Sequence, residues 1–121
     1  MSLFHSVIYT AEEWKEKGHL FSRRGNYEHA AHCYNNANEP LLSRIANSCH
    51  LEKMAELIEE GTTARQQAFN VAANEFLACA SITYWQSDKQ RIFCSFRAGN
   101  CYGRAGMDTL GKEGLIETAF C

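Results

Sequence analysis

Apolar side chains recur every three or four residues along most of the chain, which is the spacing of amphipathic helices. Between residues 11 and 39, two such stretches are separated by the turn signal Gly25-Asn26. We predict one helix that ends near Arg24 and a second helix that continues until Pro40. The pattern therefore predicts an all-α fold that begins with a helical hairpin.

Two local signals mark the start of the first predicted helix. Thr10 and Glu13 have the spacing of a capping box, in which each side chain bonds to the backbone N–H of the other residue. Tyr9 precedes the cap and Trp14 takes the fourth helical position, so the two rings can pack as a hydrophobic staple. We expect the helix to begin at about residue 11, after an N-terminal extension formed by residues 1–10.

Residues 40–61 have a less regular pattern. The apolar positions keep one phase up to Cys49 and follow another phase from Leu51 onward. A single straight helix would have to change its buried face at this point, so we predict two short helices that form a short hairpin.

Residues 62–106 carry two longer helical patterns, which we predict to form a long hairpin. Thr63 with Gln66 and Ser87 with Gln90 have capping-box spacing, and Gly106 ends the second helix. The expected apolar positions are Phe69, Ala72, Ala73, Phe76, Ala80 and Tyr84 in the first helix, and Ile92, Phe93, Phe96, Ala98, Cys101, Tyr102 and Ala105 in the second.

For residues 107–121 we predict a less stable helix, because Gly111 and Gly114 disfavour the helical state. Such a helix would partly cap a stack of hairpins. We expect residues 1–121 to form a single helical domain and to be a fragment of a larger protein.

The first hairpin contains an ordered set of large and small residues, namely Trp14, Gly18, Phe21, Gly25, Tyr27, Ala30, Tyr34 and Ala37. In spacing and type it resembles a tetratricopeptide repeat (TPR), a helix–turn–helix unit of about 34 residues. Aromatic rings supply bulk, while Gly18 and Ala30 let the two helix backbones approach each other. The resemblance implies a TPR-like α-solenoid of about three irregular antiparallel hairpins plus a weak C-terminal helix.

A second match lies 68 residues further along, twice the repeat length. AHCYNNAN (31–38) corresponds to GNCYGRAG (99–106). The signature residues of the second copy are Ala98, Cys101, Tyr102 and Ala105. More loosely, these irregular helical pairs resemble the repeat segment of TPR and ankyrin repeat-containing proteins, which join it to a helicase-like region. That resemblance implies that any ATP site lies elsewhere in the parent protein, and this sequence has no GxxxxGK[ST] phosphate loop.

Composition and charge narrow the possible functions. Hydrophobic residues make up 45% of the 121 residues and charged residues 21%, which is typical of a folded domain. The net charge is −2 and no more than two basic residues are adjacent, which argues against a nucleic-acid or membrane surface. No apolar run approaches the ~20 residues that span a bilayer, and the first residues do not form a secretory signal. We predict an intracellular, cytoplasmic location, with the nucleus left open.

The chain has six cysteines, namely Cys33, Cys49, Cys79, Cys94, Cys101 and Cys121. They lie within apolar helical patterns, where a free thiol behaves as a small hydrophobic side chain. We predict buried, reduced thiols; the alternative is a disulfide framework, which is typical of secreted domains.

His29, His32 and Cys33 are the main group of metal-ligating residue types in the sequence. His29 and Cys33 are separated by one helical turn and could face one metal ion. However, the buried face runs through Ala30 and Tyr34. A Cys–His nucleophile pair here would also lack both a helix N-terminus and a partner to orient the base. We expect no catalytic residue, no metal and no cofactor, and a metal-binding or thiol enzyme is the least favoured alternative.

The TPR resemblance implies a protein–protein interaction or scaffold module. In that family exposed positions of each hairpin's first helix line the binding groove; those positions here are Lys15, His19, Ser22 and Arg23. Two fixed positive charges suit an acidic peptide or a C-terminal carboxylate, although His19 stands where the carboxylate-clamp members have an Asn. The alternative is an intramolecular structural segment that packs against a helicase-like or ankyrin domain. An apolar end face would favour that structural role, and a polar groove with aromatic rings would favour a ligand.

Overall fold

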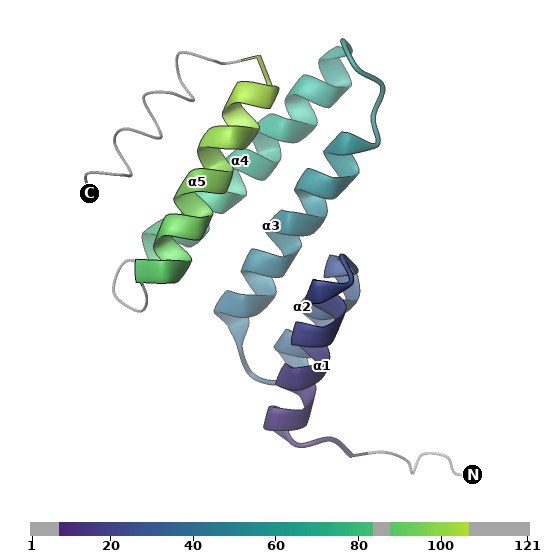
Figure 1. Ribbon diagram of the computed structural model, residues 1–121, viewed down its shortest axis with the longest axis vertical. Coiled ribbons are helices and arrows are strands. Elements are labelled where there is room, and N and C mark those ends of the chain that lie inside the picture. Colours follow the sequence, from purple (N-terminus) through teal and green to yellow (C-terminus); the bar gives the residue numbers. More distant parts are fainter. Residues whose placement is uncertain (1–7, 84–87, 107–121) are drawn as a thin grey trace. The chain divides into compact units, whose positions relative to one another are not determined.

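The computed structural model of the protein describes residues 8–83 and 88–106. These residues are 82% helical and contain no strand, which confirms the predicted all-α class. The helices are α1 (Ala11–Arg23), α2 (Tyr27–Asn36), α3 (Pro40–Glu56), α4 (Thr63–Thr83) and α5 (Asp88–Arg104), as shown in Figure 1.

The described residues fall into two compact units, and the division between them lies within α3. The first unit extends to Ala46 and the second begins at Asn47. The first therefore contains α1, α2 and the start of α3, and the second contains the rest of α3 with α4 and α5. Each unit has its own core and is described separately below.

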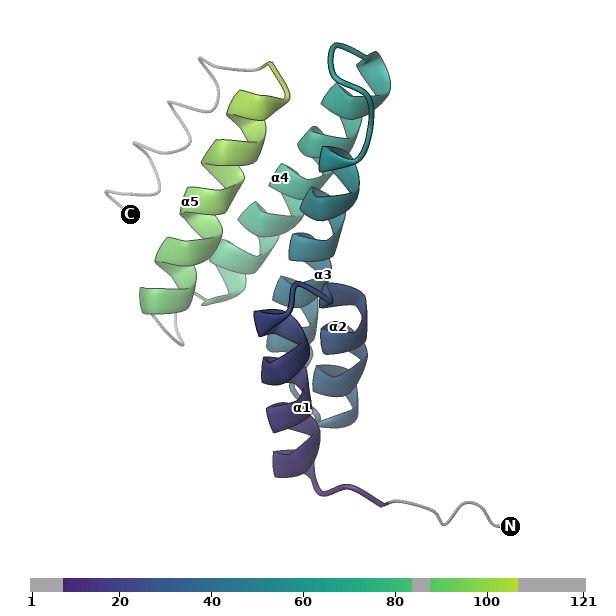
Figure 2. The same ribbon diagram turned by 45° about the vertical axis from the view of Figure 1, so that its right-hand side comes forward.

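In the first unit, α1 and α2 lie side by side and antiparallel (Figures 1 and 2). The predicted capping box is present: the Glu13 N–H donates to Thr10 Oγ1 at 3.1 Å, and the Thr10 N–H donates to Glu13 Oε1 at 2.9 Å. The Tyr9 and Trp14 rings meet edge to face with centroids 5.0 Å apart, which confirms the staple. Gly25 makes the turn with a φ of 78°.

Gly18 of α1 lies directly against the ring of Tyr34 in α2. A Cβ atom built on Gly18 would lie 2.6 Å from Tyr34 Cε1, so the Tyr34 ring occupies the space that any larger residue would need. Ala30, Tyr34 and Ala46 form the buried cluster of this unit, and partly buried Phe21 packs against it. The small residues of the signature thus allow close helix packing, as the sequence predicts.

The predicted pair of short helices in residues 40–61 is wrong, because α3 is one continuous helix from Pro40 to Glu56. Its first half contributes Ala46 to the core of the first unit, and its second half contributes Cys49 and Ala55 to the second unit. The apolar residues of α3 change phase because the two halves of this one helix pack into two different cores. Because a helix end leaves backbone groups without partners, an uninterrupted helix avoids two additional ends.

The start of α4 differs by one residue from the predicted capping box of Thr63 and Gln66. Thr62 is the cap: its Oγ1 accepts the Arg65 N–H at 3.2 Å and donates to the Glu59 carbonyl at 2.7 Å. Gly61, with a φ of 78°, turns the chain just before the cap. Thr62 and Thr63 are adjacent and chemically alike, so only the position of this turn decides which of them caps the helix.

The core of the second unit lies between α4 and α5, which pack antiparallel (Figure 1). The fully buried residues of α4 and α5 are Phe69, Ala72, Ala73, Phe76, Cys79, Cys94, Ala98 and Cys101. Three of the apolar positions expected on α5 lie outside this core: Ile92, Phe93 and Phe96 are 60%, 41% and 63% exposed. One helix face cannot hold every apolar residue of α5, and these three lie outside the buried arc. Residues 1–7, Tyr84, Ser87 and 107–121, on which further predictions rest, lie outside the described residues.

The two matching segments, which lie 68 residues apart, also agree in which of their residues are buried. All four residues of each copy are buried: Ala30, Cys33, Tyr34 and Ala37 in the first, and Ala98, Cys101, Tyr102 and Ala105 in the second. The next residue of each copy, Asn38 or Gly106, has a left-handed φ, 63° and 82° respectively. Each tyrosine hydroxyl also bonds to the helix that precedes its own. The Tyr34 hydroxyl lies 2.7 Å from His19 Nδ1, and Tyr102 donates to Asn74 Oδ1 at 2.6 Å.

Candidate functional site

The four residues of the predicted groove differ in how far their side chains are engaged within the hairpin. His19 Nδ1 lies 2.7 Å from the Tyr34 hydroxyl and Ser22 Oγ lies 3.4 Å from it, so both side chains bond within the hairpin. Burial raises the pKa of Tyr34, which keeps this hydroxyl neutral as a partner for both. Lys15 Nζ pairs with Glu39 Oε2 at 3.5 Å, while Arg23 is exposed at the end of α1. A ligand role for the four residues stays a prediction, now centred on Lys15 and Arg23.

The histidines of α2 contact the aromatic residues of α1. The rings of His29 and Phe21 lie 5.3 Å apart, and those of His32 and Trp14 lie 6.4 Å apart. His29 also bonds to Asn26, and Cys33 is buried. Within residues 8–83 and 88–106, no group of three or more His, Cys, Asp or Glu side chains is arranged to bind a metal ion.

The five described cysteines are free and buried, as predicted, whereas Cys121 lies outside the described residues. Burial raises the pKa of Cys49 to about 11 and that of Cys101 to about 12. A hydrogen bond with Cys79, followed by burial, raises the pKa of Cys94 above its usual range. Because the thiolate is the reactive form, these three thiols have the properties of core residues rather than nucleophiles.

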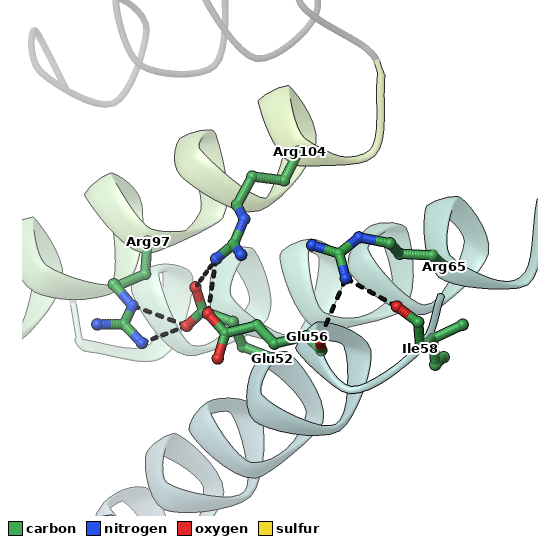
Figure 3. A network of polar contacts seen from close by, with 6 residues as sticks. All are labelled: Glu52, Glu56, Ile58, Arg65, Arg97 and Arg104. Carbon is green, nitrogen blue, oxygen red and sulfur yellow. Dashed lines mark hydrogen bonds and ion pairs between the residues drawn. The ribbon is translucent and has the colours of Figure 1, made fainter. Parts of the chain in front are cut away.

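The main polar cluster of the second unit is an arginine–glutamate network that joins α3, α4 and α5 (Figure 3). Glu52 on α3 is only 3% exposed, and Arg97 Nε of α5 donates to its Oε1 at 2.9 Å; Arg97 Nη2 contacts the same oxygen. Arg104, two turns further along α5, lies 3.7 Å from Glu52 Oε2 and donates to Glu56 Oε2 at 2.7 Å. The buried carboxylate is therefore neutralised from two points on one helix.

Arg65 of α4 completes the network through the backbone. Its Nη1 donates to the Glu56 and Ile58 carbonyls at 3.1 and 2.8 Å, which caps the C-terminal end of α3. The Arg65 and Arg104 guanidinium groups lie 5.0 and 4.5 Å from the centroid of the Phe69 ring, within cation–π distance. The side chains of the network thus hold three helices together. Arg97 and Arg104 are paired with the two carboxylates, whereas Arg65 bonds to backbone carbonyls.

Arg65 and Arg104 also border an open pocket of ≈ 410 Å³, together with Gly103 near the end of α5. Two arginines at a pocket could attract an anion. Here, however, Arg104 is paired with Glu52 and Glu56, and Arg65 is bonded to backbone carbonyls. The pocket therefore offers room for a side chain, but the guanidinium groups at its border are already engaged within the protein.

The outward face of α5 is the main exposed apolar surface on this helix. Ile92 and Phe96 are separated by one turn and project away from the buried arc that contains Cys94 and Ala98. Phe93 lies at the edge of this face, where its ring meets Phe76 with centroids 6.3 Å apart. We call Lys89, Ile92, Phe93, Phe96, Asn100 and Gly103 the outer stripe of α5, since their spacing of three or four residues places them on one side of the helix.

No protein-family model, curated protein or solved structure matches this chain. Functional assignment therefore depends on the chain's own geometry. Within the described residues, no helix is both long enough and apolar enough to cross a membrane.

Sequence reasoning missed both the arginine–glutamate network and the outer stripe. A signal for the network was present, because Arg97 and Arg104 are seven residues apart and so face the same way on a helix. Its partner Glu52, however, is 45 residues away from Arg97, and nothing in its local sequence indicates burial. A signal for the outer stripe was also present, because the apolar positions of α5 cover more of the helix than one buried face.

Proposed function

We propose that this chain is a protein–protein interaction or scaffold module built from TPR-like helical hairpins. The proposal makes it a binding element without catalytic residues or cofactor. The single observation that carries it is the outer stripe of α5, where Ile92, Phe93 and Phe96 are 60%, 41% and 63% exposed. Exposed apolar side chains that cluster on one helix face are typical of surfaces that bind another protein.

The helical-repeat part of the proposal is supported by the two matched copies. Cys33 and Tyr34 are buried, as are Cys101 and Tyr102, and both tyrosines bond to the preceding helix. Repeat proteins bury their cores by stacking similar hairpins, and the outer face of a hairpin is where the next helix packs. The exposed stripe on α5 is consistent with this mode of association.

The alternative function is a structural segment whose apolar stripe packs on a neighbouring domain of the same parent chain. An apolar face favours this role, and the engagement of His19 and Ser22 by Tyr34 weakens the case for a polar groove on α1. Both functions use α5 as a contact surface. They differ in whether the contacted protein is a separate molecule.

A photo-crosslinking experiment tests the proposed function. The full chain would carry Phe96→p-benzoylphenylalanine, with Val71→p-benzoylphenylalanine on α4 as a control of similar exposure. In a lysate, we expect adducts with other proteins at position 96 and far fewer at position 71. Equal labelling at the two positions, or no adduct with another protein at 96, would contradict an interaction module that works through α5.

A further inference from the structure

The outer stripe of α5 is narrow, and its size limits what can cover it. A large apolar side chain buries about 150–250 Å². At their observed exposures, Ile92, Phe93 and Phe96 therefore offer on the order of 300 Å² in total. A stable interface needs roughly 800 Å² from each partner. The stripe is thus too small for a stable dimer of this chain by itself, and it lies along one side of a single helix.

The ends of the stripe differ in chemistry. Lys89 is an exposed cation at the start of α5, and the other polar member, Asn100, is neutral. The acidic residue of α5, Asp88, lies 3.5 Å from Arg91 and is paired with it. A second copy of the stripe would therefore offer no free carboxylate to Lys89, whereas a helix with acidic residues beside its apolar face would provide one.

The other end of the stripe is open. A Cβ atom added to Gly103 would meet nothing within 4 Å, and Gly103 also lines the ≈ 410 Å³ pocket. A bulky side chain from a partner can therefore approach the α5 backbone closely at this point. Anchors of this kind, an aromatic or aliphatic group in a pocket, often dominate binding energy.

We propose that the outer stripe of α5 binds one amphipathic helix of another protein, with flanking acidic residues. Its apolar side chains, spaced i, i+3/i+4 and i+7, cover Ile92, Phe93 and Phe96. A carboxylate of the partner pairs with Lys89, and a bulky residue lies over Gly103. This inference rests on the proposed function and adds to it the chemistry of the partner.

The test uses the full chain and two labelled synthetic peptides of about 18 residues, long enough for several helical turns. Both have Leu at i, i+3, i+4 and i+7 and one terminal Trp, and they differ only in flanking Glu or Lys. By fluorescence anisotropy at low salt, we expect the Glu peptide to bind roughly ten-fold more tightly than the Lys peptide. Added salt should reduce this difference, because the Lys89 contact is exposed.

Three variants locate the site. Phe96→Ser should weaken the Glu peptide by roughly ten-fold, and Lys89→Gln should bring the two peptides to similar affinities. Val71→Ser on α4 should change neither affinity. Circular dichroism should show the same helical signal in all variants, since each of these side chains is exposed.

Several outcomes would overturn this inference. They are an absence of Glu-peptide binding, equal affinity for both peptides, and unchanged affinity in Phe96→Ser. A crosslinking experiment with p-benzoylphenylalanine at position 96 and the Glu peptide present gives a fourth such outcome. The inference would be overturned if adducts formed only with residues 107–121 of the same chain or with a second copy of it. If the peptide fails while position 96 still crosslinks other proteins in a lysate, the partner chemistry is wrong and the interaction function stands.

Discussion

At the scale of single residues, the contact between Gly18 and Tyr34 determines how closely α1 and α2 pack. The Tyr34 ring lies against the α1 backbone, and its hydroxyl is held by His19 and Ser22 of the same helix. A ring fixed at both its face and its hydroxyl cannot move aside without losing a hydrogen bond. The absence of a side chain at position 18 is therefore a packing requirement of this hairpin.

We expect Gly18→Ala to destabilise the protein, because the new Cβ atom would lie 2.6 Å from Tyr34 Cε1. Overpacking costs ~1–3 kcal/mol, and higher helix propensity returns about 1 kcal/mol of that. The matched control is Gly103→Ala on α5, where nothing lies within 4 Å of the new atom. Urea unfolding should show a lower free energy of unfolding for Gly18→Ala than for Gly103→Ala. Equal values would show that the Tyr34 ring yields easily.

The buried thiols predict a pH dependence of stability. Burial raises the pKa of Cys49 and Cys101 from 9.0 to about 11 and about 12. Above pH 9 the unfolded state ionises while the folded state does not. The stability that these thiols contribute is therefore complete below pH 9 and is lost as the pH rises toward 11 and 12, by about 1.4 kcal/mol per pH unit for each.

Urea unfolding between pH 8 and about pH 10.5 would test this dependence. The decline with pH should be shallower in Cys49→Ala and in Cys101→Ala than in the unaltered chain. Identical slopes would show that these thiols do not titrate with unfolding. At pH 7, a chelator and a mild reductant should leave the melting point unchanged, because the described thiols are free and core-packed.

At the scale of helices, local sequence signals place most helix ends correctly. At the start of α4, however, two adjacent residues could each serve as the N-cap. Thr62 and Thr63 both precede an apolar pattern, and the sequence favours Thr63 because Gln66 follows at the right spacing. In the structure, the left-handed turn at Gly61 positions Thr62 as the cap. The side chain at the N3 position is then Arg65, which bonds to the end of α3 instead.

Two variants separate these alternatives. Thr62→Ala should lower the free energy of unfolding by ~0.5–2 kcal/mol, the usual cost of losing an N-cap oxygen. Thr63→Ala should have little effect, because Thr63 lies inside the first turn and is exposed. Thermal or urea unfolding of both variants is sufficient. A larger loss from Thr63→Ala would restore the boundary expected from the sequence.

At the scale of the whole molecule, each unit has its own means of holding helices together. The first unit uses small residues under a tyrosine ring, and the second unit adds the arginine–glutamate network to its apolar core. A nearly buried carboxylate is costly to remove from water, so its arginine partners are required for stability. The pair also joins α3 to α5, because Glu52 and Arg97 lie on these two helices.

We expect Glu52→Gln to lower the free energy of unfolding by ~1–3 kcal/mol, because Arg97 and Arg104 lose a buried anion. The loss should be less than the ~3–5 kcal/mol of a fully buried pair, since the Arg97 side chain is 32% exposed and can be hydrated. Glu56→Gln is the control, because this carboxylate is 44% exposed. Its loss should stay below ~1 kcal/mol. Equal losses would mean that Glu52 burial does not matter.

The α1 surface supports a separate prediction. If an acidic ligand binds there, Lys15→Ala with Arg23→Ala should weaken a synthetic acidic peptide with a free C-terminal carboxylate at least several-fold, and salt should have the same effect. The melting point should change little, since the Lys15–Glu39 pair has both side chains more than a third exposed. Unchanged affinity in the double variant would exclude α1 as the binding surface.

Much of the local structure was determined by the sequence alone. Thr10 with Glu13, the Tyr9–Trp14 staple and the Gly25 turn involve residues that are close in the chain, so their chemistry can be read directly. The all-α class follows from the spacing of apolar positions. The burial of Ala30 and Ala98 likewise follows from pattern, because both lie at the same place in two similar segments.

Which apolar faces are covered and which charges are paired depends on contacts between helices that are distant in sequence. The continuity of α3 depends on two cores, and the exposure of Phe96 depends on which face of α5 is buried. Glu52 meets Arg97 across 45 residues of sequence, and Glu56 meets Arg104 across 48. Local spacing carries information about a helix and its ends. The choice of partner across such distances depends on packing, which brings together residues that have no fixed relation along the chain.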